Sequence, residues 1–431
     1  MKHVGPGVLL GDASFFGTLA AVRDLGRLGA QVVVAESSST PSHSGASRYC
    51  QQRLSAPDVH HASFLPWLLA QGAAKPGAFV YPTSDDMAWC MAMHREALGK
   101  HFTLFQSPPE AVFALLDKSQ LYGHARRLGI ALPVTHAPAH MDEVRALGQA
   151  LEQEGGFPVI VKPRTQACMA VKKKGLVVHN PEALLRAIQS MVRGGVQHAQ
   201  AMGQAAPHLE WPLVQAFMPD AQSNTYSLAG FIDTTGTVRA VRASSKVFQL
   251  PVKVGVGVAF EGRPVLPELV AQVQALAQAT GYFGVFEVEF IHVKASNRYL
   301  LMDFNPRFYG QMQFEVSRGM HLPRMVYAAA QGDEHQLTLL SEQAERHLHV
   351  QGAANQRYCN RWLFGVLLRT QHFGGRLSAA EHRQWLDWMR GAQVYDFVQD
   401  PEDPAPERAQ QRALRAHWLR HPRSSLKDLF L

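Results

Sequence analysis

A carboxylate, an amide and a guanidinium occur at every second position of the run DFNPR, in the second half of the chain. They belong to Asp303, Asn305 and Arg307, which follow the apolar run YLLM. Side chains of a strand point alternately to its two faces, so we expect Asp303 and Asn305 beside Leu301, with Met302 on the opposite, core side. Carboxylate and amide oxygens suit Mg²⁺, and a guanidinium suits phosphate. The spacing therefore predicts a polar site at the end of a buried strand.

A second acidic strand precedes this one. In GVFEVEFI, Glu287 and Glu289 alternate with apolar residues, and the break Ala295–Asn297 indicates a hairpin. A three-residue loop would set Glu289 opposite Asp303, and a shift by two residues would set it opposite Asn305. Either register holds these three side chains on one face, within cross-strand reach. Facing carboxylates repel each other unless a cation lies between them, so the pattern predicts a metal site, with a solvated hairpin face as the alternative.

The composition predicts large cores and a modest basic excess. The 431 residues are 46% hydrophobic, which favours two to four domains. The 42 Lys and Arg residues outnumber the 35 Asp and Glu residues, and apart from Lys172–Lys174 and the C-terminus they are dispersed. This pattern favours anionic small-molecule substrates over nucleic acid.

The cysteines and the apolar runs predict a cytoplasmic protein. The four cysteines are far apart and form no CxxC pair, which is typical of a reducing compartment and argues against a zinc site. The first apolar run, Val4–Leu10, is too short for a signal peptide, and no uninterrupted apolar stretch approaches about 18 residues. We therefore expect no membrane span.

The N-terminal part alternates strand and helix. VGPGVLLGD and AQVVVAE are typical of buried strands separated by the helical stretch FFGTLAAVRDLGRLG, and GAFVYPTSDD begins a further unit. This alternation predicts a parallel, doubly wound sheet with the loops GDASFFG and PTSDD beyond its strand ends, where ligands bind. The first loop lacks the GxGxxG spacing of a dinucleotide site. Asp85 and Asp86 are either a helix N-cap pair or contacts to a substrate amine.

The rest of the chain changes character twice. A helical stretch, DKSQLYGHARRLGIALP, leads to the strand GGFPVIVKPR, and the runs up to the DFNPR hairpin predict a second, largely antiparallel sheet. Beyond about Gly332 the pattern is helical and charged, and the tail from Glu402 predicts an accessory helix packed on the body or on a second subunit. The expected domains are residues 1–115, 116–210, 211–332 and 333–431.

These segments, taken in order, resemble the ATP-grasp superfamily over Val4–Gly332. The matching pieces are LDKSQLYGHARRLGIALP, FPVIVKPR, PLVQAFMPD, GVFEVEFI and LLMDFNPR. The resemblance implies an α/β and α+β protein with an N-terminal doubly wound pre-ATP-grasp domain, a two-lobed ATP-grasp fold and a helical C-terminal extension. It also implies that a carboxylate attacks the γ-phosphate of ATP to give an acyl phosphate, which an amine or another nucleophile then displaces.

The resemblance implies roles for the residues around ATP. Lys118 and Lys162 match its phosphate-binding lysines, although a lysine before Pro is also an ordinary rim residue. The loop after Lys162 is usually glycine-rich but has no glycine here before Gly175, so Lys172–Lys174 either cover the phosphates or form a solvated turn. The segment that would hold adenine between the lobes, with a plain buried strand as the alternative, is Gln215, Ala216, Phe217 and Met218.

Metal and catalytic roles follow from the same resemblance. Glu289, Asp303 and Asn305 match the ligands of Mg²⁺, as two ions or with Mn²⁺ in its place. Arg307 would stabilise the transferring phosphoryl group, a task that suits a forked and permanently charged donor, unless it forms only a structural salt bridge. Lys246 is the second expected catalytic residue.

Within the superfamily, the chain resembles the D-aspartate ligase-like carboxylate–amine ligases through QAFMPDAQSNTYSLAGFIDTTGTVRA and SSKVFQLPVKVGVGV. Ser245 and Phe248 stand where that group carries arginines, which would grip a substrate carboxylate. This difference predicts a less acidic or more apolar acceptor than D-aspartate. The positions that fit the group's pattern are Lys246, Gln249, Pro251, Gly255 and Gly257.

The expected function is that of an ATP-dependent ligase that joins a carboxylate to an amine and releases ADP and phosphate. Two alternatives stay open, a carboxylase-type enzyme that activates bicarbonate and a nucleotide-binding regulatory protein without turnover. The expected partners are small-molecule carboxylate and amine substrates, and the C-terminal helix is compatible with a homodimer.

Overall fold

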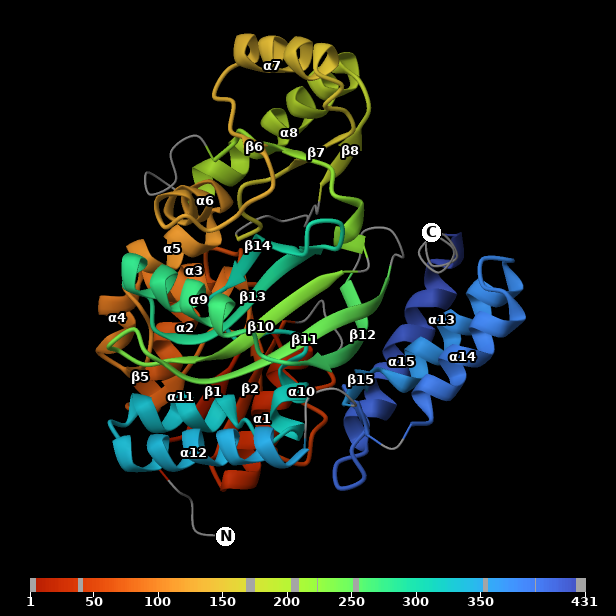
Figure 1. Ribbon diagram of the computed structural model, residues 1–431. Coiled ribbons are helices and arrows are strands. Elements are labelled where there is room, and N and C mark those ends of the chain that lie inside the picture. Colours follow the sequence, from red (N-terminus) through yellow and green to blue (C-terminus); the bar gives the residue numbers. More distant parts are fainter. Residues whose placement is uncertain are drawn as a thin grey trace.

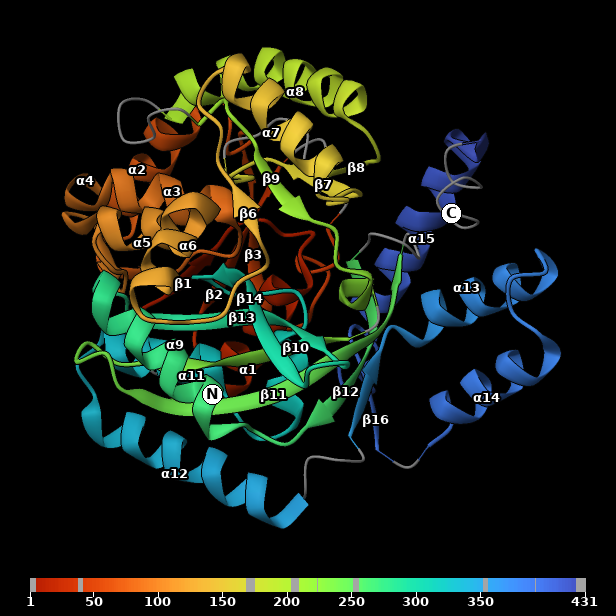
Figure 2. The same ribbon diagram turned by 45° about the horizontal axis from the view of Figure 1, so that its top comes forward.

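Within the residues that it describes, the computed structural model shows three sheets, with helices packed around them and a helical unit to one side (Figures 1 and 2). Of the positions considered above, Val4, Lys172–Lys174, Pro251 and Gly255 lie outside the described residues. The described residues are 5–37, 42–167, 175–202, 209–222, 224–250, 256–351, 356–391 and 393–423.

The N-terminal sheet is parallel and doubly wound, as predicted. Its strand order is β3-β2-β1-β4-β5, and its central strands are short apolar runs buried on both faces because helices cover both. The strands are β1 (Val8–Leu10), β2 (Val32–Ser37), β3 (Cys50–Ala56), β4 (Ala78–Val80) and β5 (Phe102–Leu104). The helices are α1 (Phe16–Leu28), α2 (Phe64–Ala74), α3 (Asp85–Met93), α4 (Arg95–Gly99) and α5 (Pro109–Leu116).

A four-stranded sheet follows, with the order β6-β9-β7-β8. Its helices α7 and α8 pack over it as a separate lobe (Figure 1). Because β9 pairs with β7 along its whole length, residues 213–216 belong to this sheet, and the expected domain boundary after residue 210 lies one strand too early. The elements are α6 (Lys118–Arg127), β6 (Thr135–His136), α7 (Met141–Gln153), β7 (Val159–Lys162), β8 (Leu176–Val178), α8 (Pro181–Met202) and β9 (Leu213–Ala216).

The largest sheet has seven strands in the order β14-β13-β10-β11-β12-β15-β16. Every residue of β10 is buried, since α9 covers one face of the sheet while α1 and α11 pack on the other. The strands are β10 (Thr225–Ile232), β11 (Val238–Leu250), β12 (Val256–Arg263), β13 (Gly284–Val293), β14 (Arg298–Asn305), β15 (Arg357–Cys359) and β16 (Val394–Asp396). The helices are η2 (Pro219–Gln222), α9 (Pro267–Thr280), α10 (Met312–Ser317), α11 (Leu322–Ala330) and α12 (Glu334–Gln351).

The predicted hairpin is formed by β13 and β14, but its turn is longer than a three-residue loop. Val293 pairs with Arg298, which leaves four residues in the loop. A bulge then shifts the register beyond Glu289, and this shift brings Glu289 opposite Asp303. The first predicted pairing is therefore correct, although the bulge rather than the turn produces it.

The same bulge overturns the predicted facing of two residues in β14. Leu301 is fully buried in the apolar core beside Phe304, whereas Met302 lines a cavity together with Asp303. A regular strand would place Leu301 and Asp303 on one face. The extra residue of the bulge interrupts that alternation at Met302, and the cavity is lined by the four consecutive residues from Met302 to Asn305.

The C-terminal part is largely helical, but it also extends the seven-stranded sheet. Its strand β15 pairs with β12, and β16 pairs with β15, so the expected helical extension also contributes two short strands to the sheet. Buried Arg23 of α1 donates to Asp403 Oδ2 over 2.9 Å, which fixes the start of the last helix on the body. The helices are α13 (Arg361–Phe373), α14 (Ala379–Met389) and α15 (Ala405–Arg420). None of the helices in the described ranges is long and apolar enough to cross a membrane.

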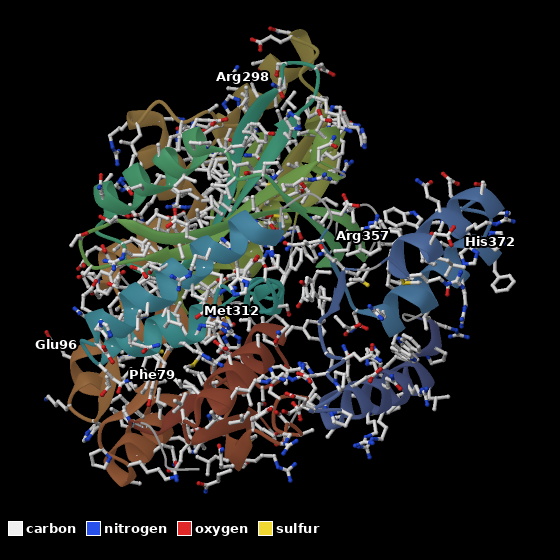
Figure 3. All side chains as sticks on the ribbon, turned by 60° about the horizontal axis from the view of Figure 1, so that its bottom comes forward. Phe79, Glu96, Arg298, Met312, Arg357 and His372 are labelled. Carbon is white, nitrogen blue, oxygen red and sulfur yellow. The ribbon has the colours of Figure 1, made fainter. Side chains whose placement is uncertain are left out.

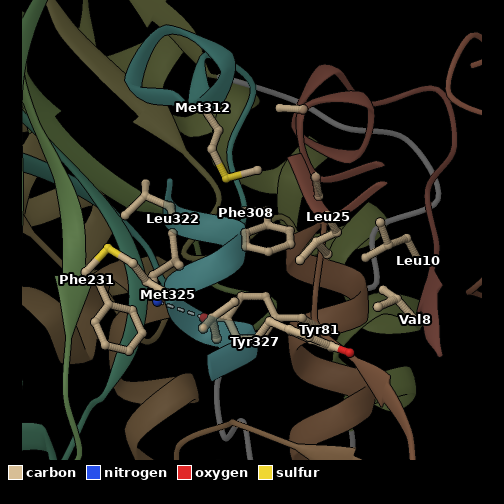
Figure 4. Packing of buried hydrophobic residues seen from close by; sticks show 14 of the residues in the cluster. Val8, Leu10, Leu25, Tyr81, Phe231, Phe308, Met312, Leu322, Met325 and Tyr327 are labelled. Atoms are coloured by element: carbon tan, nitrogen blue, oxygen red, sulfur yellow. Dashed lines mark hydrogen bonds between the residues drawn. The ribbon is translucent and has the colours of Figure 1, made fainter. Parts of the chain in front are cut away.

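The N-terminal domain and the seven-stranded sheet share one hydrophobic core (Figure 4). Phe308, directly after Arg307, lies beside Tyr81 with ring centroids 4.6 Å apart. Its backbone N–H donates to the carbonyl of Pro82 over 3.1 Å. The position of Arg307 relative to the N-terminal domain is therefore set by a buried neighbour.

Candidate active site

One cavity of about 350 Å³ collects side chains from the four-stranded and seven-stranded sheets and from helices of the N-terminal domain. Every expected site residue within the described ranges lines it, although those residues are spread over nearly two hundred positions of the chain. They are Lys118, Lys162, Gln215, Ala216, Phe217, Met218, Lys246, Glu289, Asp303, Asn305 and Arg307. Expected Lys174 lies outside the described residues.

The end of the β13–β14 hairpin supplies the oxygen-bearing side chains. Glu289 and Asp303 stand directly opposite each other on the two strands. Lys118, the first residue of α6, donates from Nζ to Asp303 Oδ1 over 2.6 Å. Burial disfavours the charged form of Lys118, but Asp303, with Tyr122 and Asp85, outweighs this effect and raises the pKa of the ammonium. A cation of the protein thus lies against the predicted metal-binding carboxylates.

Arg307 is held by three hydrogen bonds. Its Nε donates to Asp85 Oδ1 over 2.5 Å, its Nη2 to Asn305 Oδ1 over 2.9 Å, and its Nη1 to the carbonyl of Phe308 over 3.0 Å. Burial alone would lower the pKa of the guanidinium, but Asp85 raises it. The guanidinium of Arg307 is therefore pre-oriented in the cavity. The structural salt bridge, which is the alternative role for Arg307, is also present and involves Asp85.

Asp85 enters the site from the N-terminal domain, 222 residues away along the chain. Of the two alternatives for Asp85 and Asp86, the structure rules out the N-cap pair, because Ser84 is the N-cap of α3 and its hydroxyl accepts from the backbone N–H of Met87. Asp85 lies in the first turn of α3 and pairs with Arg307, while Asp86 lies 3.5 Å from His60. Nothing in the sequence indicates that Asp85 and Arg307, which are so far apart along the chain, form a pair.

Glu287 is a third carboxylate of this group, and sequence reasoning did not assign it to the site. It is fully buried, and it accepts hydrogen bonds from Asn305 Nδ2 at 2.5 Å and Gln311 Nε2 at 2.9 Å. Burial, assisted by the charge of nearby Glu289, raises the pKa of Glu287 to about 8. Its spacing of two from Glu289 on a strand was the available signal.

Lys162 lies at the end of β7, where it faces β9. Its Nζ donates to Gln215 Oε1 over 2.7 Å and lies 5.9 Å from the ring centre of Tyr122. The amide of Gln215 in turn donates to Thr135 Oγ1 over 2.8 Å. Lys162 is nearly fully buried, so its ammonium is directed into the cavity by a network of fixed polar partners.

The cavity also has an apolar lining that suits a flat ring. The expected hinge residues, at the end of β9 and directly after it, belong to this lining together with residues from both lobes. A planar heterocycle placed among such side chains is desolvated on both faces, while backbone groups at the strand end stay available for its edge. The apolar lining consists of Leu116, Ile160, Ala216, Phe217, Met218, Ala221, Ile291, Met302 and Phe304.

The two positions that differ from the D-aspartate ligase-like pattern lie away from the cavity lining. The hydroxyl of Ser245 accepts from Arg263 Nε over 3.1 Å. Phe248 packs against Phe364 of α13, with ring centroids 5.0 Å apart. The aromatic ring of Phe248 therefore contributes to the C-terminal core, and the prediction of a more apolar acceptor has no support from that side chain. Lys246 lines the cavity.

The donor set suits a hard divalent cation. Glu289, Asp303 and Asn305 present two carboxylates and an amide on the same hairpin, beside a cavity that also contains cationic side chains. Among the described residues there is no group of three or more His, Cys, Asp or Glu side chains with the geometry of a metal site. Oxygen donors without His or Cys fit Mg²⁺ or Mn²⁺ rather than zinc.

Comparisons with known proteins show the fold. Neither the family models nor the curated proteins give a match. Among solved structures, the chain is similar to the biotin carboxylase domain of 2-oxoglutarate carboxylase from Hydrogenobacter thermophilus. That match has a TM-score of 0.59 and 15% identity, and it covers 77% of this chain and 70% of that one.

Two ligases of other kinds share the arrangement. An L-amino acid ligase from Bacillus licheniformis matches with a TM-score of 0.55 and 12% identity, over 77% of both chains. N5-carboxyaminoimidazole synthetase from Staphylococcus aureus matches with a TM-score of 0.53 and 13% identity, over 77% of this chain and 80% of that one. The chain therefore has the ATP-grasp fold that the resemblance predicted.

Proposed function

We propose that the protein is an ATP-dependent ligase that activates a carboxylate as an acyl phosphate and joins it to an amine. The observation that carries this proposal is the cavity that Lys118, Lys162 and Arg307 line together with the oxygen donors of the β13–β14 hairpin. Cations that converge from separate segments suit a polyphosphate, and the apolar part of the cavity suits the base of a nucleotide.

Each proposed role follows from the position of a side chain. Lys118 and Lys162 bind phosphate oxygens of ATP, and the segment from Gln215 to Met218 contacts adenine. Arg307 has a fixed fork that can stabilise charge on the transferred phosphoryl group, which is the kind of preorganised donor that lowers a barrier. Lys246 also lines the cavity, which supports a role for it at the activated carboxylate.

The proposed reaction consists of two displacement steps. A carboxylate oxygen of the first substrate attacks the γ-phosphorus, and ADP leaves with the bridging oxygen. The amine nitrogen then attacks the acyl carbon, loses a proton, and phosphate leaves. Glu289, Asp303 and Asn305 would hold Mg²⁺, which neutralises phosphate charge when it is bound.

The fold neighbours support this class and one alternative. Their names describe an L-amino acid ligase and a phosphoribosylglycinamide synthetase from Anaerococcus prevotii, and a biotin carboxylase domain seen with MgADP and bicarbonate. The last observation favours bicarbonate as a second candidate for the activated acid.

Measurement of ADP release distinguishes a carboxylate–amine ligase from a bicarbonate-activating carboxylase and from a protein that only binds nucleotide. The purified protein is incubated with ATP, Mg²⁺ and a panel of carboxylic acids and amino acids, alone and in pairs, with bicarbonate as a separate arm. We expect release that requires both an acid and an amine, with an amide product by mass spectrometry. Release with bicarbonate and no amine would support the carboxylase instead. Nucleotide binding without release in every arm would contradict both enzymes.

A further inference from the structure

Two polar residues on the same strand reach the cavity from positions that a regular strand would separate. Lys246 and Gln249 of β11 both line it, although residues three apart on a strand face opposite sides. The pairing of β11 with β12 shifts twice in this stretch, once before Phe248 and once after it. These two irregularities turn both polar side chains toward the cavity and the residues between them away from it.

The residues between them pack on the C-terminal helices. Val247 and Phe248 pack against a hydrophobic cluster that is built mainly from α13 and α14. We call these two helices the helical pair. The ring of Phe248 lies 5.0 Å from that of Phe364 in α13 and 5.7 Å from that of Trp385 in α14. An aromatic side chain is thus inserted between two helices at the point where the strand is irregular.

The helical pair is itself anchored to the sheet beside β11. Trp388 of α14 donates from Nε1 to Glu261 Oε1 of β12 over 2.6 Å, and its backbone carbonyl accepts from Arg357 of β15 over 2.9 Å. Figure 3 shows Arg357 where the helical pair joins the body and His372 farther out on that unit. The helices therefore form a fixed support rather than a free appendage.

We infer that the helical pair positions Lys246 and Gln249 in the cavity by holding Phe248 on the opposite side of β11. An irregular strand has fewer ladder hydrogen bonds to specify its conformation, so the local path of the chain depends on which side chains are buried and where. Phe248 is half-buried, and its ring contacts with α13 and α14 make it the anchor of this stretch. Phe248 and the helical pair thus act as positioning elements, and neither lies among the residues that line the cavity.

This inference rests on the proposed function only in giving Lys246 a role in turnover. The geometry itself predicts a physical coupling between α13 and a strand segment more than a hundred residues earlier in the chain. It also gives Phe248 a reason to stand where the D-aspartate ligase-like pattern carries an arginine.

Hydrogen exchange followed by mass spectrometry tests the coupling without any substrate. The full-length protein is compared with Phe364→Ala, and with Phe248→Leu in case the first variant disturbs the whole unit. We expect amides of residues 244–250 to exchange roughly tenfold faster in both, the scale of a lost aromatic contact, while β10 (Thr225–Ile232) keeps its protection. Phe364→Leu should restore part of the protection.

Trp362→Ala is the matched control. Trp362 also belongs to α13, but it stacks on Trp418 of α15, with ring centroids 5.6 Å apart. It should leave residues 244–250 unchanged. Equal exchange of this segment in wild type, Phe364→Ala and Phe248→Leu would overturn the inference, and so would an equal acceleration by Trp362→Ala.

Turnover provides the second readout. With the substrates found by the ADP-release panel, Phe248→Leu and Phe364→Ala should lower kcat/KM for the acid and amine about tenfold, while the affinity for ATP measured by calorimetry stays the same. Faster exchange in the two variants, with no turnover by the wild-type protein, would refute the proposed ligase and still support the positioning role. Turnover without any change in exchange or kcat/KM would refute the positioning role and leave the ligase intact.

Discussion

Replacement of Arg307 by lysine separates a catalytic role from a structural one. The arginine makes three hydrogen bonds, to Asp85, Asn305 and the carbonyl of Phe308. A lysine keeps the positive charge but has one nitrogen at the end of a flexible chain, so it cannot reproduce the fork. The side chains of the wild-type salt bridge are mostly buried, with Arg307 13% exposed and Asp85 24% exposed, and this burial limits screening of the pair by solvent.

The expected magnitudes follow from these contacts. Loss of a hydrogen bond to a charged group typically costs about 1.5–3 kcal/mol, so Arg307→Lys should lower the free energy of unfolding by a value in that range. If the fork also stabilises charge that develops during phosphoryl transfer, kcat should fall by roughly ten- to a thousandfold, the usual scale for one preorganised donor. Affinity for ATP should change little, because that charge is absent from the ground state.

Asp85→Asn is the matched control. It weakens the same salt bridge from the other side but leaves the guanidinium in the cavity. Denaturant unfolding, ATP calorimetry and ADP release are measured for both variants. We expect similar losses of stability but a much larger loss of kcat for Arg307→Lys. Equal stability loss with near wild-type kcat in Arg307→Lys would refute the catalytic role and leave only the salt bridge.

Three further predictions test other parts of the structure. Lys162→Met should weaken ATP binding by about 1.5–3 kcal/mol in calorimetry, because a charged donor is lost, and unchanged affinity would remove Lys162 from the site. Asp303→Ala and Asn305→Ala should abolish Mg²⁺-dependent ADP release with little change in Tm, and near wild-type rates at limiting Mg²⁺ would contradict the metal assignment. Burial lowers the pKa of His43 to about 4, so the unfolded chain binds the extra proton. Stability should therefore fall by roughly 3 kcal/mol as pH drops from about 6.5 to 4, and His43→Phe should flatten that slope in pH-dependent unfolding.

Local patterns predicted much of the fold and of the candidate site. The alternation of apolar and acidic residues in β13 and β14 placed Glu289 and Asp303 on facing strands, because the period of a strand is a property of the backbone. The βα alternation of the N-terminal part predicted its parallel sheet for the same kind of reason. Predictions of this type depend on neighbours within a few residues.

Predictions of which face a side chain occupies were wrong where a strand contains an extra residue and so departs from the two-residue period. The bulge in the hairpin moved Met302 to the cavity and Leu301 into the core. The irregular pairing around Phe248 moved that ring to the C-terminal helices instead of the acceptor side. A single extra residue reverses every later side chain, and the sequence carries no marker of its position.

By itself, then, the sequence determined the residue types of the site and the strands that present them, since these depend on local chain geometry and on the chemistry of each side chain. Only the tertiary structure decided which distant groups meet. Asp85 pairs with Arg307, and the C-terminal strand β15 adds to the edge of the central sheet, because each buries surface or charge that has no complement nearby in the chain. Such pairings are selected by the free energy of the whole packed molecule, which a window of sequence does not contain.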